Sequence, residues 1–260
     1  MKKPLFRLAL LATVASTLLI NVPLFASDTD ARIESSAQES YVFKNYLKED
    51  NIKMQSKDGV VTLTGTVSDP SHKSLAQETV ANLPGVTGVD NKLKDKGEAA
   101  AQTDAWLITK VKSTLLFHKN VNAIGTEVMA QNGTITLRGE ATSLAQKDLT
   151  AEYAMDVEGV KNVTNEMTVP PTAMETGQKT MVKKMDTMGE AIDDASITAL
   201  VKTTLLYHRS TSALNTIVKT KEGVVTLGGK ATTAAEKDLA GKFATDVHGV
   251  KVVVNNMTVE

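Results

Sequence analysis

Apolar residues recur in the same order three times along this chain. Each time, a helical stripe is followed by two alternating strands, a second helical stripe and a third strand. In the two most similar copies, the first stripe consists of Leu107, Val111 and Leu115, and of Ile197, Val201 and Leu205. A spacing of four residues places such side chains on one face of an amphipathic helix. The pattern therefore predicts three small α-β-β-α-β units.

The second strand of each unit alternates between apolar and polar positions, which is typical of a strand with one buried face. A dipeptide ending in glycine precedes each of these strands, and glycine supplies the positive φ that a tight hairpin turn requires. These turn glycines are Gly59, Gly133 and Gly223. A second set falls on the apolar face, where we expect the missing side chain to let a helix approach closely. This set is Gly65, Gly139 and Gly229.

The end of each unit repeats two further features. The second helix is expected to end at a glycine in the left-handed C′ position, with a valine after it. These glycines are Gly85, Gly159 and Gly249. The last strand then places an asparagine on its inward face, at Asn91, Asn165 and Asn255. A buried amide is costly unless it is bonded, so we interpret these asparagines as structural ties from strand to loop, with a ligand site as the alternative.

Internal similarity sets the domain boundaries. Residues 104–169 align with residues 194–259 without a gap, and 32 of the 66 positions are identical. The first copy is more divergent and spans residues 28–95, and the third extends to residue 260. Each unit predicts two helices on one face of a three-stranded mixed sheet, which is an α+β fold. Domains of about 65 residues bury only about 60% of their unfolded surface, so we expect the units to contact one another.

Two further segments lie outside the units. Lys2, Lys3 and Arg7 precede an apolar run from Leu8 to Ile20, which predicts a signal peptide over residues 1–26, cleaved after Ala26. The run is shorter than the roughly 20 apolar residues of a transmembrane helix. Residues 170–193 are a predicted linker with a short amphipathic helix. Its methionines are Met181, Met185 and Met188, and they suit either docking on the next domain or an adaptable contact surface.

Composition excludes several classes of function. The chain has no cysteine, hence no disulfide, thiol nucleophile or thiolate metal site, and a net charge of −1 that becomes −4 without the signal peptide. This mild acidity argues against nucleic-acid binding. No residue pattern indicates a catalytic site, a metal site, a cofactor or a small-molecule substrate, so we expect a protein that is not an enzyme. His118 and His208 follow the first helices of their units, where a cation is favourable.

The segments DAWLITKVKSTLL, GTITLRG and GVKNVTNEMTV, with their counterparts in the other units, resemble the BON domain family. The resemblance covers nearly all of the chain after residue 26, and the chain has three units where an arrangement of two is known in the family. It implies a periplasmic location, association with phospholipid or other envelope surfaces, and a role in osmotic or envelope stress. Some members of the family look chaperone-like.

The first helix of the second unit holds the best candidate for a binding surface. Trp106 lies beside the apolar stripe, Lys110 and Lys112 follow it on the same helix, and Phe117 ends the helix. Tryptophan near lysine is typical of an interfacial membrane contact, so the candidate partner is a phospholipid surface. The alternative is that Trp106 packs against a neighbouring unit. A second hypothesis for the protein as a whole is a chaperone-like factor that binds envelope proteins.

Overall fold

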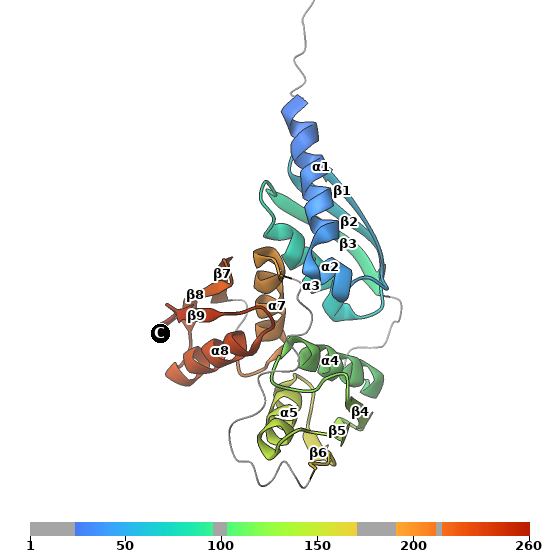
Figure 1. The fold of residues 1–260 in the computed structure, drawn as a ribbon, viewed down its shortest axis with the longest axis vertical. Coiled ribbons are helices and arrows are strands. Elements are labelled where there is room, and N and C mark those ends of the chain that lie inside the picture. The colour runs from blue at the N-terminus through green and yellow to red at the C-terminus, as the bar shows by residue number, and fades with distance from the viewer. Residues whose placement is uncertain (1–23, 96–102, 171–190, 212–214) are drawn as a thin grey trace, which may run out of the picture.

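The computed structural model describes residues 24–95, 103–170, 191–211 and 215–260, and Figure 1 shows their arrangement. The methionines of the predicted linker helix and nearly all of the predicted signal peptide lie outside the described residues. Within the described residues, no helix is long and apolar enough to cross a membrane. The described chain forms three small α+β domains in sequence order, as predicted.

The first domain contains one helix more than its two counterparts, a single turn after the first long helix. Its elements are α1 (Leu24–Glu39), α2 (Tyr41–Asn45), β1 (Asn51–Lys57), β2 (Val60–Val67), α3 (Pro70–Ala81) and β3 (Gly88–Asp95). Those of the second domain are α4 (Asp104–Phe117), β4 (Thr126–Gln131), β5 (Thr134–Gly139), α5 (Leu144–Asp156) and β6 (Asn162–Asn165). Those of the third domain are α7 (Asp194–Tyr207), β7 (Thr216–Lys221), β8 (Val224–Ala231), α8 (Ala234–Asp246), β9 (Val252–Asn255) and β10 (Thr258–Val259).

The three sheets share one topology. The hairpin strands pair antiparallel, and the last strand pairs parallel with the second strand of the hairpin, which is therefore central. The alternation in the central strand matches its burial, since Ile135 and Leu137 are fully buried beneath the helices and Thr134 and Thr136 are not. Each domain is thus a two-layer sandwich with its core between the sheet and two helices.

The hairpin turns have positive φ at both central residues, for example 53° at Asn132 and 82° at Gly133. An aspartate at the start of the first helix holds each turn. In the second domain, the Asp104 carboxylate accepts hydrogen bonds from the backbone N–H groups of Asn132 at 2.8 Å and Gly133 at 3.0 Å. Asp30 and Asp194 do the same in the other domains. These aspartates were not predicted from the sequence, although they stand at a constant spacing from the turn glycine.

The glycines on the apolar face of the central strand are required for a reason other than the one expected. A Cβ at Gly139, where φ is 126°, would lie 2.1 Å from the carbonyl oxygen of Gly125 at the start of the paired strand. A Cβ added at Gly65 or at Gly229 would lie equally close to a backbone oxygen of the paired hairpin strand. The close neighbour is therefore the adjacent strand and not a helix, and the positive φ suits glycine.

The glycines after the second helix also lie elsewhere than predicted. Helix α5 is capped by Val157, so Gly159 comes two residues after the cap and not at the C′ position. Its φ is 93°, and an added Cβ would lie 3.0 Å from Leu107 on the first helix. Gly249 faces Ile197 in the same way. These glycines let the turn after the second helix pack closely on the first helix of the same domain.

Each inward asparagine of the last strand is bonded on both sides of its amide. Asn165 donates from Nδ2 to the carbonyl of Lys147 at 2.7 Å and accepts from the N–H of Met167 at 3.2 Å. Asn91 and Asn255 make the equivalent bonds. Because Lys147 lies in α5, the amide ties the strand to the second helix and not to a loop.

The three domains contact one another through their helices, and the sheets lie toward the outside (Figure 1). Helix α7 is buried on most of its surface. The hydroxyl of its Ser196 accepts a hydrogen bond from the N–H of Val42 in the first domain at 3.1 Å. The first domain also reaches the second, since Ser113 Oγ on α4 donates to Asp69 Oδ2 at 2.5 Å. The expectation that the units pack together is confirmed.

Candidate functional site at the interface of the second and third domains

The four residues predicted as a lipid-contacting cluster do not share one exposed surface. Lys112 is exposed and Trp106 is half-buried, but Lys110 is only 7% exposed to solvent and Phe117 only 1%. The Phe117 ring packs edge-on against Tyr46 of the first domain, with ring centroids 5.6 Å apart. Phe117 is therefore part of a contact between domains, and Trp106 and Lys112 are the members of the set that reach solvent.

Lys110 is held between the second and third domains. Its Nζ lies 4.4 Å from the centroid of the Trp106 ring and 5.2 Å from that of Tyr207 in the third domain. The same Nζ forms an ion pair with Glu158 at 3.2 Å. An ammonium between two aromatic faces and a carboxylate is stabilised by cation–π and ionic attraction. Trp106 contacts Lys110, and Lys110 contacts Tyr207 of the third domain. Trp106 therefore reaches the interface between units through Lys110, which favours the alternative prediction for this residue.

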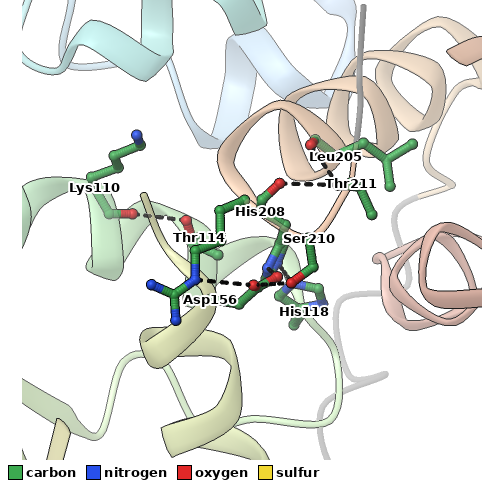
Figure 2. A network of polar contacts seen from close by, with 9 residues as sticks. Lys110, Thr114, His118, Asp156, Leu205, His208, Ser210 and Thr211 are labelled. Atoms are coloured by element: carbon green, nitrogen blue, oxygen red, sulfur yellow. Dashed lines mark hydrogen bonds and ion pairs between the residues drawn. The ribbon is translucent and has the colours of Figure 1, made fainter. Parts of the chain in front are cut away.

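The centre of the interface is a pair of buried histidines. The Nε2 atoms of His118 and His208 lie 3.1 Å apart, and each side chain is about 1% exposed. Each histidine directly follows the first helix of its domain, and the two positions are equivalent in the internal repeat. Figure 2 shows both rings, together with Asp156 and Ser210, at the meeting point of α4, α5 and α7.

The neighbours of one histidine have equivalent neighbours at the other. His208 Nδ1 lies 3.0 Å from the carboxylate of Asp156, and His118 Nδ1 lies 3.3 Å from that of Asp246, the equivalent residue in the repeat. Each histidine ring also stacks on an aromatic ring of its own domain, and the two aromatic residues are equivalent in the repeat. Tyr153 lies 3.8 Å from His118 between centroids, and Phe243 lies 4.0 Å from His208.

The backbone repeats this reciprocity. The N–H of Arg209 donates to the carbonyl of Asp156 at 2.9 Å, and the N–H of Lys119 donates to that of Asp246 at 2.8 Å. Short antiparallel bridges join His118 to Val247 and His208 to Val157. The second and third domains therefore meet as the two halves of an isologous dimer do, with the same patch used on both sides.

The symmetry is broken at one hydroxyl. Tyr153 donates a hydrogen bond from its OH to Asp246 Oδ2 at 2.6 Å, whereas its counterpart Phe243 has no such group. A second donor is present on both sides, since Ser210 donates to Asp156 and its counterpart Asn120 donates to Asp246. Asp156 also lies 3.6 Å from the Arg209 guanidinium. His118 Nδ1 makes no hydrogen bond of acceptable geometry, although Asp246 lies near it. The third-domain carboxylate is thus occupied by Tyr153, and His118 faces it less favourably.

Burial governs the protonation of this cluster. It lowers the pKa of His118 to about 4, against the opposing effect of Asp246, so the ring is neutral at pH 7. The expectation of a cation at this helix end is therefore wrong for His118, because the helix end is covered by another domain. Burial opposes ionisation of Asp156, yet hydrogen bonds from His208 and Ser210 hold its pKa below the ordinary value.

The arrangement suits a structural role better than a chemical one. Both histidines are inaccessible to a substrate, and the neighbouring hydroxyl of Tyr153 is engaged by Asp246, with its pKa raised mainly by burial. In the described part of the chain, no three histidine, aspartate or glutamate side chains are grouped to hold a metal ion. The cluster fixes the relative orientation of two domains, and its signal in the sequence was the recurrence of histidine and aspartate at an offset of 90.

Three sandwiches of this topology, two of them joined through equivalent helix ends, define a protein of tandem small α+β modules. The chain belongs to the BON domain family, whose model matches residues 29–96, 103–171 and 193–260.

Three curated proteins are similar to this chain. It is 28% identical over 197 residues to osmotically-inducible protein Y of Escherichia coli (strain K12), covering 76% of this chain and 92% of that protein. It is 29% identical over 150 residues to a 21 kDa hemolysin of Actinobacillus pleuropneumoniae, covering 54% and 77%. It is 29% identical over 135 residues to outer membrane lipoprotein DolP of Haemophilus influenzae, covering 51% and 68%.

Proposed function

We propose that this protein is a non-catalytic periplasmic protein of the cell envelope that binds phospholipid surfaces during osmotic or envelope stress. The observation that carries the proposal is membership of the BON domain family over three domains, with relatives named for osmotic induction and for the outer membrane. The basic and apolar start of the chain, with predicted cleavage after Ala26, supports export.

The candidate lipid contact in the second domain is the exposed side of α4. Trp106 is half-buried near the start of the helix and Lys112 is exposed six residues further on, so an amphipathic ring and a cation reach solvent from the same helix. Such a combination suits the headgroup region of an anionic bilayer. Lys110 contacts the Trp106 ring through its ammonium group, and Phe117 packs against Tyr46 of the first domain.

Trp106 is the one tryptophan of the sequence, so its fluorescence reports on this surface alone. The experiment adds phosphatidylglycerol vesicles to the chain from Ser27 onward and records the emission maximum. Insertion of Trp106 into the interface predicts a shift to shorter wavelength, and Trp106→Ala is expected to weaken co-sedimentation. If the protein sediments with vesicles while its emission stays unchanged, Trp106 is not the contact.

A chaperone-like function is the second candidate. Exposed apolar side chains on all three domains, such as Val60, Ile124 and Leu206, favour it because such side chains can receive an unfolded client. The test is an aggregation assay with a heat-denatured client at equimolar amounts. Suppression of aggregation supports this function, and unchanged aggregation counts against it.

A further inference from the structure

The outer face of the third sheet carries apolar side chains that are open to solvent. Ile217 is 59% exposed, Val252 53%, Val254 41% and Val224 37%. These residues alternate with the buried ones along β7, β8 and β9, so all four lie on the face opposite to the helices. The sheets lie toward the outside of the molecule, which leaves this face accessible (Figure 1).

Strand register joins these side chains into one patch with two lysines. Lys221 pairs with Val224, which pairs with Val252, and so forms one row across the sheet. Lys219, Thr226 and Val254 form the next row. Neighbours within a row have Cβ atoms about 5 Å apart. The third-sheet patch, Ile217, Lys219, Lys221, Val224, Val252 and Val254, is thus continuous, apolar toward β9 and cationic along β7.

The fold does not require this composition. The second domain is identical to the third at about half of its positions, yet its corresponding outer face is polar apart from Met129, which stands in place of Lys219. Glu127 stands in place of Ile217, Thr134 in place of Val224, and Asn162 and Thr164 in place of the two β9 valines. The first sheet is polar as well, apart from Val60. A difference confined to one solvent-facing surface of a repeated fold indicates a use for that surface.

The charges of the patch select its partner. Lys219 and Lys221 form no ion pair within the described residues, and no acidic side chain lies on the β7, β8 or β9 part of this face. The six patch residues include no carboxylate. The acidic residues at its borders are Glu222 in the hairpin turn and Glu260 after β10, and Glu260 is already paired with Lys230. An anionic bilayer offers phosphates to the lysines and an apolar boundary to the valines, and lysine side chains can extend from one to the other.

We propose that the third-sheet patch is a membrane-contact surface for anionic phospholipid, separate from Trp106. The sheet lies against the bilayer, with Ile217, Val252 and Val254 at the boundary of headgroups and acyl chains, and with Lys219 and Lys221 on lipid phosphates. This proposal rests on the proposed lipid-binding function and assigns it a second surface.

The test replaces patch residues by those that the same fold already carries in the second domain. I217E/V252N/V254T removes the apolar part, and K219M/K221Q removes the charges. The chain from Ser27 onward is sedimented with vesicles of phosphatidylglycerol in phosphatidylcholine. Loss of each lysine is expected to weaken binding roughly fivefold. The apolar variant is expected to lose at least as much, since it places a carboxylate against anionic lipid.

Matched controls address the same positions of the second sheet. T134S/N162S/T164S is expected to leave binding unchanged, and E127I/N162V/T164V is expected to strengthen it. Circular dichroism and sedimentation velocity verify that each variant keeps the fold and the oligomeric state. Wild-type binding by both patch variants would overturn the third-sheet proposal and leave the proposed function intact, whereas wild-type protein that binds no vesicle would contradict the function itself. Self-association that the patch variants abolish, without an effect on lipid, would assign the patch to a second copy.

Discussion

The Nε2 atoms of His118 and His208 lie 3.1 Å apart, in a row that runs from Asp156 through both rings to Asp246. The row has three links between side chains, and His118, whose pKa is lowered by burial, supplies a single ring proton at pH 7. The unbonded Nδ1 of His118 fits a state in which His118 donates from Nε2 to His208, and His208 donates from Nδ1 to Asp156. The third link, to Asp246, is then left without a proton.

This row predicts that acid weakens the folded state. The pKa of His118 falls from 6.5 to about 4 on folding, so below pH 6.5 the unfolded chain binds a proton that the folded one does not. The contribution is present above pH 6.5 and is lost progressively as the pH falls toward 4, by at most about 3 kcal/mol. Urea unfolding at several pH values measures it. His118→Phe is expected to flatten this dependence, and His72→Gln, outside the interface, is expected to leave it in place.

The histidine pair also predicts a non-additive double-mutant cycle. Replacing either ring by phenylalanine leaves the other Nε2 buried without its partner, at a cost of about 1–3 kcal/mol. His118→Phe together with His208→Phe removes both polar groups, so the double variant is expected to lose less stability than the two single losses combined. Chemical denaturation of the four proteins gives the coupling. Additive losses would show that the two rings do not depend on each other.

Tyr153 and Phe243 provide a matched pair across the pseudo-two-fold axis. Tyr153→Phe leaves an oxygen of buried Asp246 without its donor and is expected to cost about 1–3 kcal/mol. Phe243→Leu, which changes the equivalent ring without touching a hydrogen bond to Asp246, separates loss of the hydroxyl from loss of aromatic stacking. Equal stability of wild type and Tyr153→Phe, measured in urea, would contradict the role given to this hydroxyl.

Two glycine-to-alanine substitutions distinguish backbone strain from the simple addition of a methyl group. Gly139→Ala would place a methyl group 2.1 Å from the oxygen of Gly125 at a φ of 126°, and we expect a loss of roughly 2 kcal/mol or more. Gly228→Ala meets Ile217 Cβ at 3.8 Å, which is ordinary contact, so it is expected to change stability little. Thermal unfolding compares the two. Similar melting temperatures for both variants would remove the strain argument.

The sequence predicted the fold of each domain because periodicity and turn chemistry are local. Val111 and Leu115 could be placed in a core from their spacing, and Gly133 could be placed in a hairpin turn from its neighbours. The neighbour of Gly139 is set by the pairing of two strands, which the sequence of either strand alone does not determine. The need for glycine was therefore predicted for the wrong reason.

The interface could not be predicted in the same way. Lys110 carries a charge on a helix, which is normally a solvated position, and its burial follows from Tyr207 and Glu158 arriving from other parts of the chain. The sequence predicted a cation at His118 because it does not reveal that the third domain covers this helix end. The repeated histidine and aspartate positions were visible at the offset of 90, but their meeting required the docking of two domains.

Co-sedimentation of the unmodified chain from Ser27 onward with vesicles is the decisive test of phospholipid binding by this protein. We expect it to sediment with phosphatidylglycerol vesicles, to stay in solution with phosphatidylcholine, and to be released as salt rises from about 50 mM to about 500 mM, because salt screens exposed lysines. Protein that stays in solution with both vesicles at low salt would contradict a membrane-binding function and would favour protein partners in the envelope.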